Sequence, residues 1–225
     1  MDLPASLFAP GPLLACNALA GFALALAAWR VDWKRLPGEA LNAWMGACVL
    51  VMALWLMKGG LKPGLSFHLL GATVFTLLMG PWLALLALAL VLAALAAGGH
   101  GDWTSLGLNW LLAGAMPVGV SAAVLAFCRR HLPAQLFVYV FVNAFLTGGL
   151  SLFLCGAGGV AALGLAGAYP ADYLLDEALP FYFLLSWSEA FISGLVMAIL
   201  IVYRPQWVAT FDDVRYLGRE PDDND

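Results

Sequence analysis

Residues 65–97 decide the fold, and they read LSFHLLGATVFTLLMGPWLALLALALVLAALAA. The run is almost entirely apolar, and His68 is the only histidine that falls within a predicted membrane segment. As one helix, at 1.5 Å per residue, the run would be about 50 Å long, whereas the hydrocarbon core of a bilayer is about 30 Å thick. Gly80-Pro81 lies near the middle, and such a pair is a natural helix break. We therefore predict two spans here, 65–80 and 81–97.

The composition is that of an integral membrane protein. The 225 residues are 63% hydrophobic and only 11% charged, and the mean hydropathy is +0.90. Soluble domains carry roughly a quarter charged residues. Spans in lipid must pair their own backbone groups, and the unbroken apolar runs favour helices over a barrel. We expect a protein of the bacterial plasma (inner) membrane, with the lipid bilayer as its solvent and no nucleic acid as a partner.

We predict an all-α, polytopic membrane helix bundle of about seven transmembrane helices, with the N-terminus outside and the C-terminus cytoplasmic. The five spans besides the two in 65–97 are 13–29, 40–57, 106–127 (bent at Pro117), 135–155 and 181–203. Residues 1–204 are expected to form one membrane domain. Residues 205–225 are expected to form a polar cytoplasmic tail that is partly disordered.

The positive charges set the predicted orientation, because lysine and arginine gather in cytoplasmic loops. Only Lys58 and Lys62 then lie outside. The cytoplasmic side holds the other eight: Arg30, Lys34, Arg35, Arg129, Arg130, Arg204, Arg215 and Arg219. A further crossing at Gly156–Ala168 would make the count five against five. We therefore interpret that glycine-rich stretch as a re-entrant or interfacial piece, with a loose apolar loop as an equal alternative.

His68 is the first candidate for the site. In the predicted helix it lies about one turn inside the span and shares a face with Gly64, Gly71 and Ala72. That small-residue face leaves room beside the imidazole, and neutral imidazole is a common transition-metal ligand. Two interpretations stay open: a metal ligand, or a histidine that is hydrogen-bonded to a neighbouring helix.

Other polar residues lie within or beside the predicted spans. Glu189 is the only carboxylate deep in a span, and a charge there is costly unless it is paired, hydrated or protonated. It could bind a cation, relay a proton or hold helices together, and the last role is favoured because no basic partner lies at its depth. Tyr182 shares its stripe of the helix, Asn143 lies on a second polar stripe, and Asn109 is typical of a helix-packing residue.

The predicted loops and termini add further candidates. His100 and Asp102 form a possible access or gating loop near the outer face, although a loop histidine is usually only solvated. The basic turn 128–131 and the tail could dock a partner or anchor the chain at the membrane surface. No nucleotide-binding loop, Ser-His-Asp constellation or HExxH motif is present. We therefore expect that the chain is not an enzyme and that any energy comes from partners or ion gradients.

Four segments, in the same order and with similar spacing over 65–194, resemble the CbiM/NikM family. These are the substrate-capturing membrane components of cobalt and nickel energy-coupling-factor transporters. The matching segments are SFHLLGA at 66–72, LMGPW at 78–82, TSLGLN at 104–109 and SEAFISG at 188–194.

The resemblance implies a seven-helix bundle that takes up Co²⁺ or Ni²⁺ as its substrate, with no permanently bound cofactor. It also implies a separate coupling membrane protein and ATPase subunits as partners. The ligands would be the Met1 amine, Asp2 and His68, with Asn109 and Glu189 in support. The chain departs from the family's motifs at two positions where histidines are typical. These positions hold Asp2 and Tyr182.

The leading hypothesis is a membrane subunit of a transition-metal uptake transporter. Two alternatives stay open. The same fold could carry a non-metal or proton-coupled solute through Glu189. Otherwise the chain could be a non-transporting scaffold in which Glu189 and His68 only tie helices together.

Overall fold

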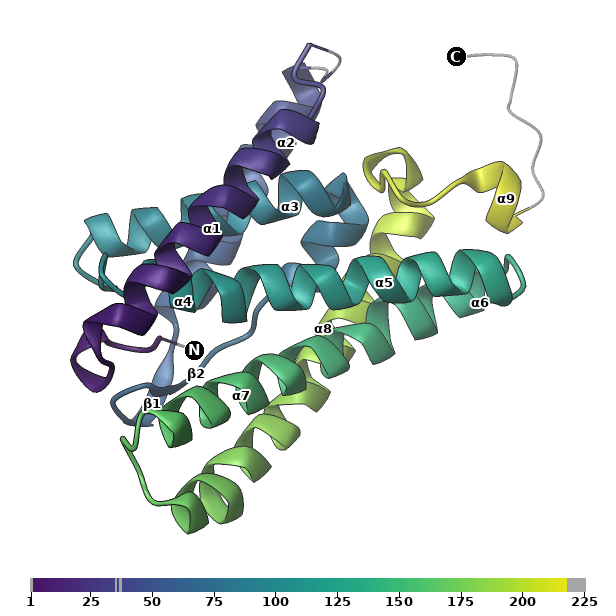
Figure 1. Cartoon of the computed structure of the whole chain (residues 1–225). Coiled ribbons are helices and arrows are strands. Elements are labelled where there is room, and N and C mark those ends of the chain that lie inside the picture. Colours follow the sequence, from purple (N-terminus) through teal and green to yellow (C-terminus); the bar gives the residue numbers. More distant parts are fainter. Residues whose placement is uncertain (1, 35, 37, 218–225) are drawn as a thin grey trace.

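The structure is a computed structural model that describes residues 2–34, 36 and 38–217, and it forms a bundle of long helices (Figure 1). The α-helices are α1 (Pro10–Arg30), α2 (Gly38–Leu56), α3 (Ala72–Ala97), α4 (Leu106–Trp110), α5 (Met116–His131), α6 (Leu136–Val138), α7 (Thr147–Leu165), α8 (Leu179–Tyr203) and α9 (Asp213–Leu217). π-Helical turns at Leu111–Ala115, Tyr139–Leu146 and Tyr173–Ala178 join some of these into longer continuous helices. Short 3-10 helices lie at Ala5–Leu7 and Pro205–Trp207.

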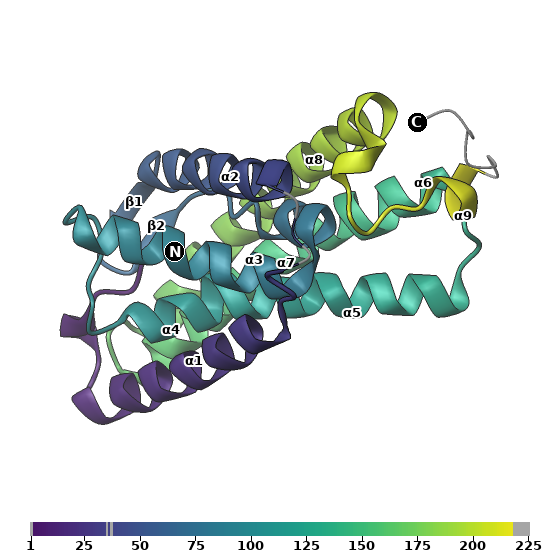
Figure 2. The same cartoon turned by 90° about the horizontal axis from the view of Figure 1, so that it is seen from above.

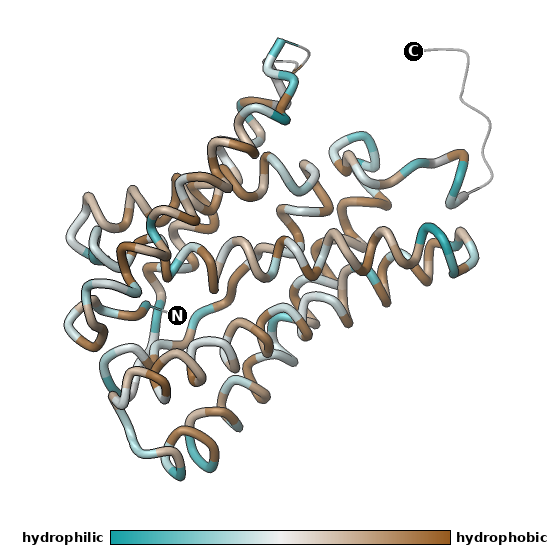
Figure 3. Tube along the Cα trace, in the orientation of Figure 1, coloured by the Kyte–Doolittle hydropathy of each residue, from teal (hydrophilic) through white to brown (hydrophobic). Residues whose placement is uncertain are grey.

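The bundle has the surface of a membrane protein. Among the described residues, five helices are long and apolar enough to cross a membrane, and Leu41–Leu56 is a shorter apolar helix. Figure 3 shows hydrophobic residues along the long helices, with hydrophilic ones gathered mainly near loops and helix ends. Large apolar side chains such as Phe22 and Leu184 are exposed, as expected of a surface that meets lipid. The prediction of an all-α, polytopic integral-membrane bundle is confirmed.

The two ends of the bundle hold different parts of the chain (Figures 1 and 2). At the hairpin end, β1 (Gly59–Lys62) pairs antiparallel with β2 (Leu65–Phe67) beside the N-terminal segment. α9 lies at the opposite end, called here the tail end. Lys58 and Lys62 lie at the hairpin end. The other described cations lie at the tail end: Arg30, Lys34, Arg129, Arg130, Arg204 and Arg215. This asymmetry favours a cytoplasmic tail end.

Helix α3 is broken where the glycine–proline pair predicts a break. Gly80 has φ 78° and ψ 164°, which lie outside the helical region. The first half ends at the tail end, where the carbonyl of Leu77 accepts the backbone N–H of Thr210. The second half runs back to the hairpin end, so residues 65–97 traverse the bundle twice.

The predicted helix over 65–80 is wrong in its first part. Residues 65–67 form strand β2, residues 68–70 are not helical, and the helix starts at Ala72. Gly64 and Gly71 have φ of 80° and 66°, a left-handed conformation that suits glycine and turns the chain on either side of His68. His68 therefore does not share a helical face with these glycines.

The interpretation of 156–168 as a re-entrant piece or loose loop is also wrong. The helix that contains α7 is continuous from Leu136 to Leu165, and the next runs from Tyr173 to Tyr203. A Cβ on Gly156 would lie 2.3 Å from Cγ of Tyr182, so the missing side chain allows α7 and α8 to approach closely. Each helix exceeds the roughly 20 residues that a bilayer requires, so both extend beyond the predicted spans. The remaining predicted spans agree with the observed helices to within a few residues.

The residues after α8 pack back onto the tail end. The Thr210 hydroxyl donates to the Leu77 carbonyl at 2.6 Å, and Arg129 donates to the Thr210 carbonyl at 2.7 Å. Val208 is buried in a hydrophobic cluster that also contains Leu77. Residues 218–225, which include the part of the tail that we predict to be disordered, lie outside the described residues. The described part of the tail is thus held by the bundle.

Gly156 gives a direct test of the packing between α7 and α8. We expect Gly156→Ala to lower the free energy of unfolding by about 1–3 kcal/mol, because the added methyl overpacks the contact with Tyr182. Thermal unfolding of the purified protein in detergent measures this change. Gly119→Ala is the matched control, because nothing lies within 4 Å of a Cβ at that helical position. Equal stability of the two variants would contradict the role of Gly156 in helix packing.

Candidate metal site

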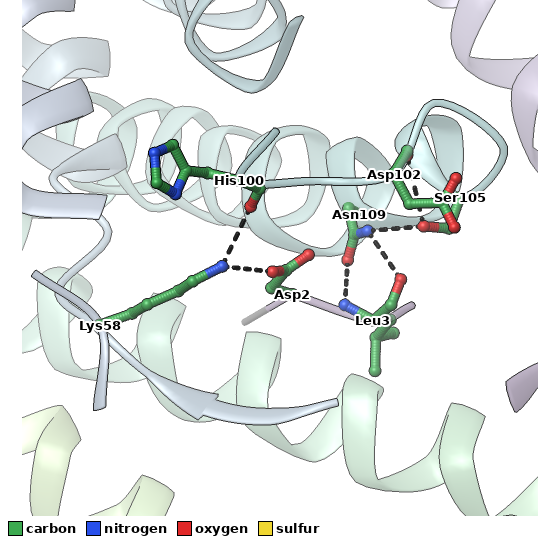
Figure 4. Close-up of polar contacts among 7 residues, drawn as sticks. All are labelled: Asp2, Leu3, Lys58, His100, Asp102, Ser105 and Asn109. Carbon is green, nitrogen blue, oxygen red and sulfur yellow. Dashed lines mark hydrogen bonds and ion pairs between the residues drawn. The ribbon is translucent and has the colours of Figure 1, made fainter. Parts of the chain in front are cut away.

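Asn109 holds the N-terminal segment against the hairpin end of the bundle (Figure 4). Its side-chain oxygen accepts the backbone N–H of Leu3 at 2.8 Å. Its side-chain nitrogen donates to the Leu3 carbonyl at 3.0 Å and to the Ser105 hydroxyl at 3.2 Å. Leu3 itself is fully buried. The sequence predicts that Asn109 joins helices; in the structure its long-range hydrogen bonds instead hold Leu3, in the non-helical segment before α1.

Asp102 fixes the same segment two residues further along. Its two carboxylate oxygens accept the backbone N–H of Thr104 at 2.9 Å and of Ala5 at 3.1 Å. The hydrogen bond from Thr104 lowers the pKa of Asp102 most, burial opposes this, and the bond from Ala5 adds to the lowering. The carboxylate therefore stays ionised at neutral pH. In this arrangement Asp102 anchors the N-terminal segment.

His68 lies in the non-helical segment between β2 and α3, and its side chain is buried. Its Nδ1 lies 3.0 Å from the Leu69 carbonyl oxygen. A carbonyl only accepts, so this hydrogen bond requires the proton on Nδ1 and leaves the lone pair of the neutral ring on Nε2. Trp55 of α2 packs against the ring, with centroids 5.0 Å apart. This is the tautomer in which an imidazole coordinates a metal through Nε2.

Asp2 and Lys58 form an ion pair at the hairpin end (Figure 4). The Nζ of Lys58 lies 2.5 Å from a carboxylate oxygen of Asp2 and donates to the His100 carbonyl at 3.0 Å. This role of Lys58 is not predicted from the sequence, in which the residue serves only as one of the charges that indicate the orientation of the bundle. No motif marks the residue. The only local signal is a lysine directly after an apolar span, at the end of the bundle where cations are scarce.

One small cavity brings these residues together. Its volume is about 20 Å³, which is enough for roughly one water molecule or one ion without its hydration shell. The lining residues are Asp2, Trp55, Lys58, His68, Leu92, Leu95, Ala96, His100, Gly101, Asp102, Leu106 and Asn109. Within the described ranges, no group of three or more His, Cys, Asp or Glu side chains could hold a metal ion. Met1, which we also predict as a ligand, lies outside the described residues.

Glu189 does not line this cavity. Its two oxygens accept the backbone N–H groups of Leu70 and Gly71, each at 2.8 Å, and the side chain is only 2% exposed. These two groups lie at the point where the extended segment becomes helix α3. Of the three roles left open for Glu189, this geometry matches the structural one.

Tyr182 and Asn143 also lie away from the cavity. The Tyr182 hydroxyl donates to the Ser66 carbonyl at 3.3 Å, and its ring packs on Phe67 with centroids 4.9 Å apart. Tyr182 therefore supports strand β2. Asn143 is 1% exposed, and neither polar atom of its side chain has a hydrogen-bond partner among the described residues. Of the described candidates, the structure thus gathers Asp2, His68 and the loop residues His100 and Asp102 at one cavity, and it leaves Tyr182 and Asn143 in the helix packing.

Removal of the Asn109 side chain should release the N-terminal segment. Asn109→Ala leaves the buried N–H and carbonyl of Leu3 without partners, which costs about 1–3 kcal/mol for each group. We expect faster amide exchange at residues 2–5, measured by hydrogen–deuterium exchange with mass spectrometry. Asn143→Ala is the matched control, because it removes a buried asparagine that holds no partner in the described chain. Similar exchange at residues 2–5 in the two variants would argue against the clamp.

Known proteins provide an independent comparison. A crystal structure described as a truncated transition metal transporter has a TM-score of 0.79 and 20% sequence identity, over 90% of this chain and 99% of that chain. A second, described as a transition metal transporter, has a TM-score of 0.78 and 19% identity, over 89% of this chain and 92% of that one. At these identities the similarity shows a shared fold. No curated protein matches the chain.

A family match carries more weight because it covers nearly the whole bundle. Residues 2–207 match the CbiM family, described as the cobalt uptake substrate-specific transmembrane region. The matched range includes every residue that lines the cavity. The resemblance noted in the sequence is confirmed, and the chain belongs to this family of cobalt uptake membrane proteins.

Proposed function

We propose that the chain is the substrate-capturing membrane subunit of an energy-coupling-factor uptake transporter for a divalent transition metal, Co²⁺ or Ni²⁺. The family description supports a metal as the cargo. One structural observation supports the site. Asn109 holds the N-terminal segment so that Asp2 lines the same cavity as His68. The proposed ligands are the Met1 amine, Asp2 and His68.

The size of the cavity favours an ion over an organic solute. Pockets for small organic ligands typically enclose about 300–1,000 Å³. The cavity beside His68 measures about 20 Å³, which suits a single ion that has lost most of its water. This size argues against a small organic cargo at His68; it does not bear on Glu189, which lines a separate, mostly apolar cavity of about 510 Å³.

The residues around the cavity have complementary roles in capture. Nitrogen donors such as the Nε2 of His68 suit Co²⁺ and Ni²⁺, and the Asp2 carboxylate offsets part of the ion's charge. Asn109 and Asp102 hold the N-terminal segment in place through hydrogen bonds to its backbone. Little conformational entropy of this segment is therefore lost when the metal binds. The cavity lies at the hairpin end, and the charge asymmetry favours this end as the outer face, on which an imported metal would arrive.

The contacts of Glu189 do not favour the proton-coupled alternative, because both carboxylate oxygens accept hydrogen bonds from backbone N–H groups. The proposed energy source is a set of separate ATPase subunits linked through a coupling membrane protein. Metal uptake by cells that express the chain with and without such subunits tests this part. Uptake that is independent of ATPases and abolished by Glu189→Gln would instead favour a gradient-driven carrier.

Replacement of His68 tests the metal site itself. We expect His68→Ala to weaken Ni²⁺ or Co²⁺ binding by at least about 100-fold, since even residues that only orient a ligand contribute about 10–100-fold. Titration calorimetry on the purified protein measures the affinity. His131→Ala is the matched control, because that histidine stacks on Phe127 at the tail end and should not affect binding. If the wild-type protein binds neither ion at micromolar concentrations, the metal assignment fails.

A further inference from the structure

Lys58 places an ammonium group at the proposed metal site. Its Nζ contacts the Asp2 carboxylate at 2.5 Å and the His100 carbonyl at 3.0 Å. Lys58, Asp2 and His68 line one cavity of about 20 Å³ (Figure 4 shows the first two with His100). Asp2 is the only carboxylate among the proposed ligands, and it is the group that Lys58 contacts.

A divalent ion that binds Asp2 would lie close to this ammonium, because both would use one carboxylate at a small cavity. Like charges repel strongly where little water separates them. The Lys58 side chain is 30% exposed and has a flexible four-carbon stem, so its head can swing from the cavity towards solvent. Lys62, at the same end, points elsewhere. Its Nζ lies 3.6 Å from the centroid of the Tyr173 ring.

We propose that Lys58 is a tethered competitor of the transported metal, and this inference rests on the proposed function. In the metal-free protein the ammonium neutralises Asp2. A metal ion binds Asp2 only by displacing the Lys58 head. A weakly coordinating cation, which lacks affinity for the His68 nitrogen, cannot compensate for the lost ion pair. Lys58 thereby raises the selectivity of the site at the expense of affinity.

Calorimetry with Ni²⁺ on the full chain tests this role. We expect Lys58→Met, which keeps length and removes charge, to bind Ni²⁺ roughly ten-fold tighter or more, within the range of coupling between contacting residues. Lys58→Arg keeps the charge and should bind as weakly as the wild type. Lys62→Met is the matched control and should change nothing. In an Asp2→Asn background the gain from Lys58→Met should shrink, because the contested carboxylate is absent.

The outcomes separate this inference from the proposed function. If the wild type binds Ni²⁺ and Lys58→Met binds no tighter, the inference is overturned and the metal site stands. If Lys58→Met binds Ni²⁺ and the wild type does not, Lys58 competes as inferred, but the proposal that the wild-type chain takes up this ion fails. If no variant binds, both ideas fall.

Amine labelling followed by mass spectrometry gives a readout of the displaced head group. Saturating Ni²⁺ should raise the labelling rate of Lys58 several-fold and leave that of Lys62 unchanged. Asp2→Asn should raise the Lys58 rate without any metal. If the Lys58 rate is unaffected when Ni²⁺ is bound, the ammonium has not moved and the inference is overturned.

Discussion

The Glu189 carboxylate accepts hydrogen bonds from two backbone N–H groups, those of Leu70 and Gly71. At these two residues the chain changes from extended to helical inside the bundle. In hydrocarbon an unpaired backbone group costs several kcal/mol, so irregular backbone persists only where protein groups satisfy it. Trp55 and Tyr182 donate to carbonyls of the same stretch, and β1 pairs with its first residues. These contacts allow residues 65–71 to remain non-helical at a position where a helix would otherwise be required. His68 is carried by that stretch, and its place at the cavity therefore depends on Glu189.

The short first half of α3 connects the two ends of the bundle. Its start is fixed by Glu189, next to the segment that carries His68. Its last turn is fixed by the Thr210 backbone and hydroxyl, which both bond to the Leu77 carbonyl. Gly80 ends the helix directly after these contacts. The tail, which faces the cytoplasm in the predicted orientation, is thus linked to the His68 segment through one helix of about two turns.

The sequence predicts the features of this fold that depend on local chemistry, and misses those that depend on distant partners. Apolar runs, charge asymmetry and Gly80-Pro81 predict the spans and the break in α3. The start of α3 is not predicted correctly, because a short apolar run is compatible with either a strand or a helix. The group that determines where the helix starts is Glu189, which lies 119 residues from Leu70 in the sequence. From the sequence, Gly156 is interpreted as part of a re-entrant piece or loop, because its packing partner Tyr182 lies on a distant part of the chain. In the site, Asp2, His68 and the other lining candidates follow from topology and resemblance, whereas Lys58 belongs to no motif.

The pairing of Asp2 with Lys58 also gives a physical account of the departure from the family's histidine. A neutral imidazole needs no counterion. A carboxylate that is only partly exposed, as the Asp2 side chain is at 31%, is stabilised by a nearby cation. An aspartate at position 2 therefore calls for a cation when no metal is bound, and Lys58 supplies one from the end of α2. On this argument Asp2 and Lys58 form one charge-balanced unit, in which the ammonium and the metal ion neutralise the same carboxylate in turn.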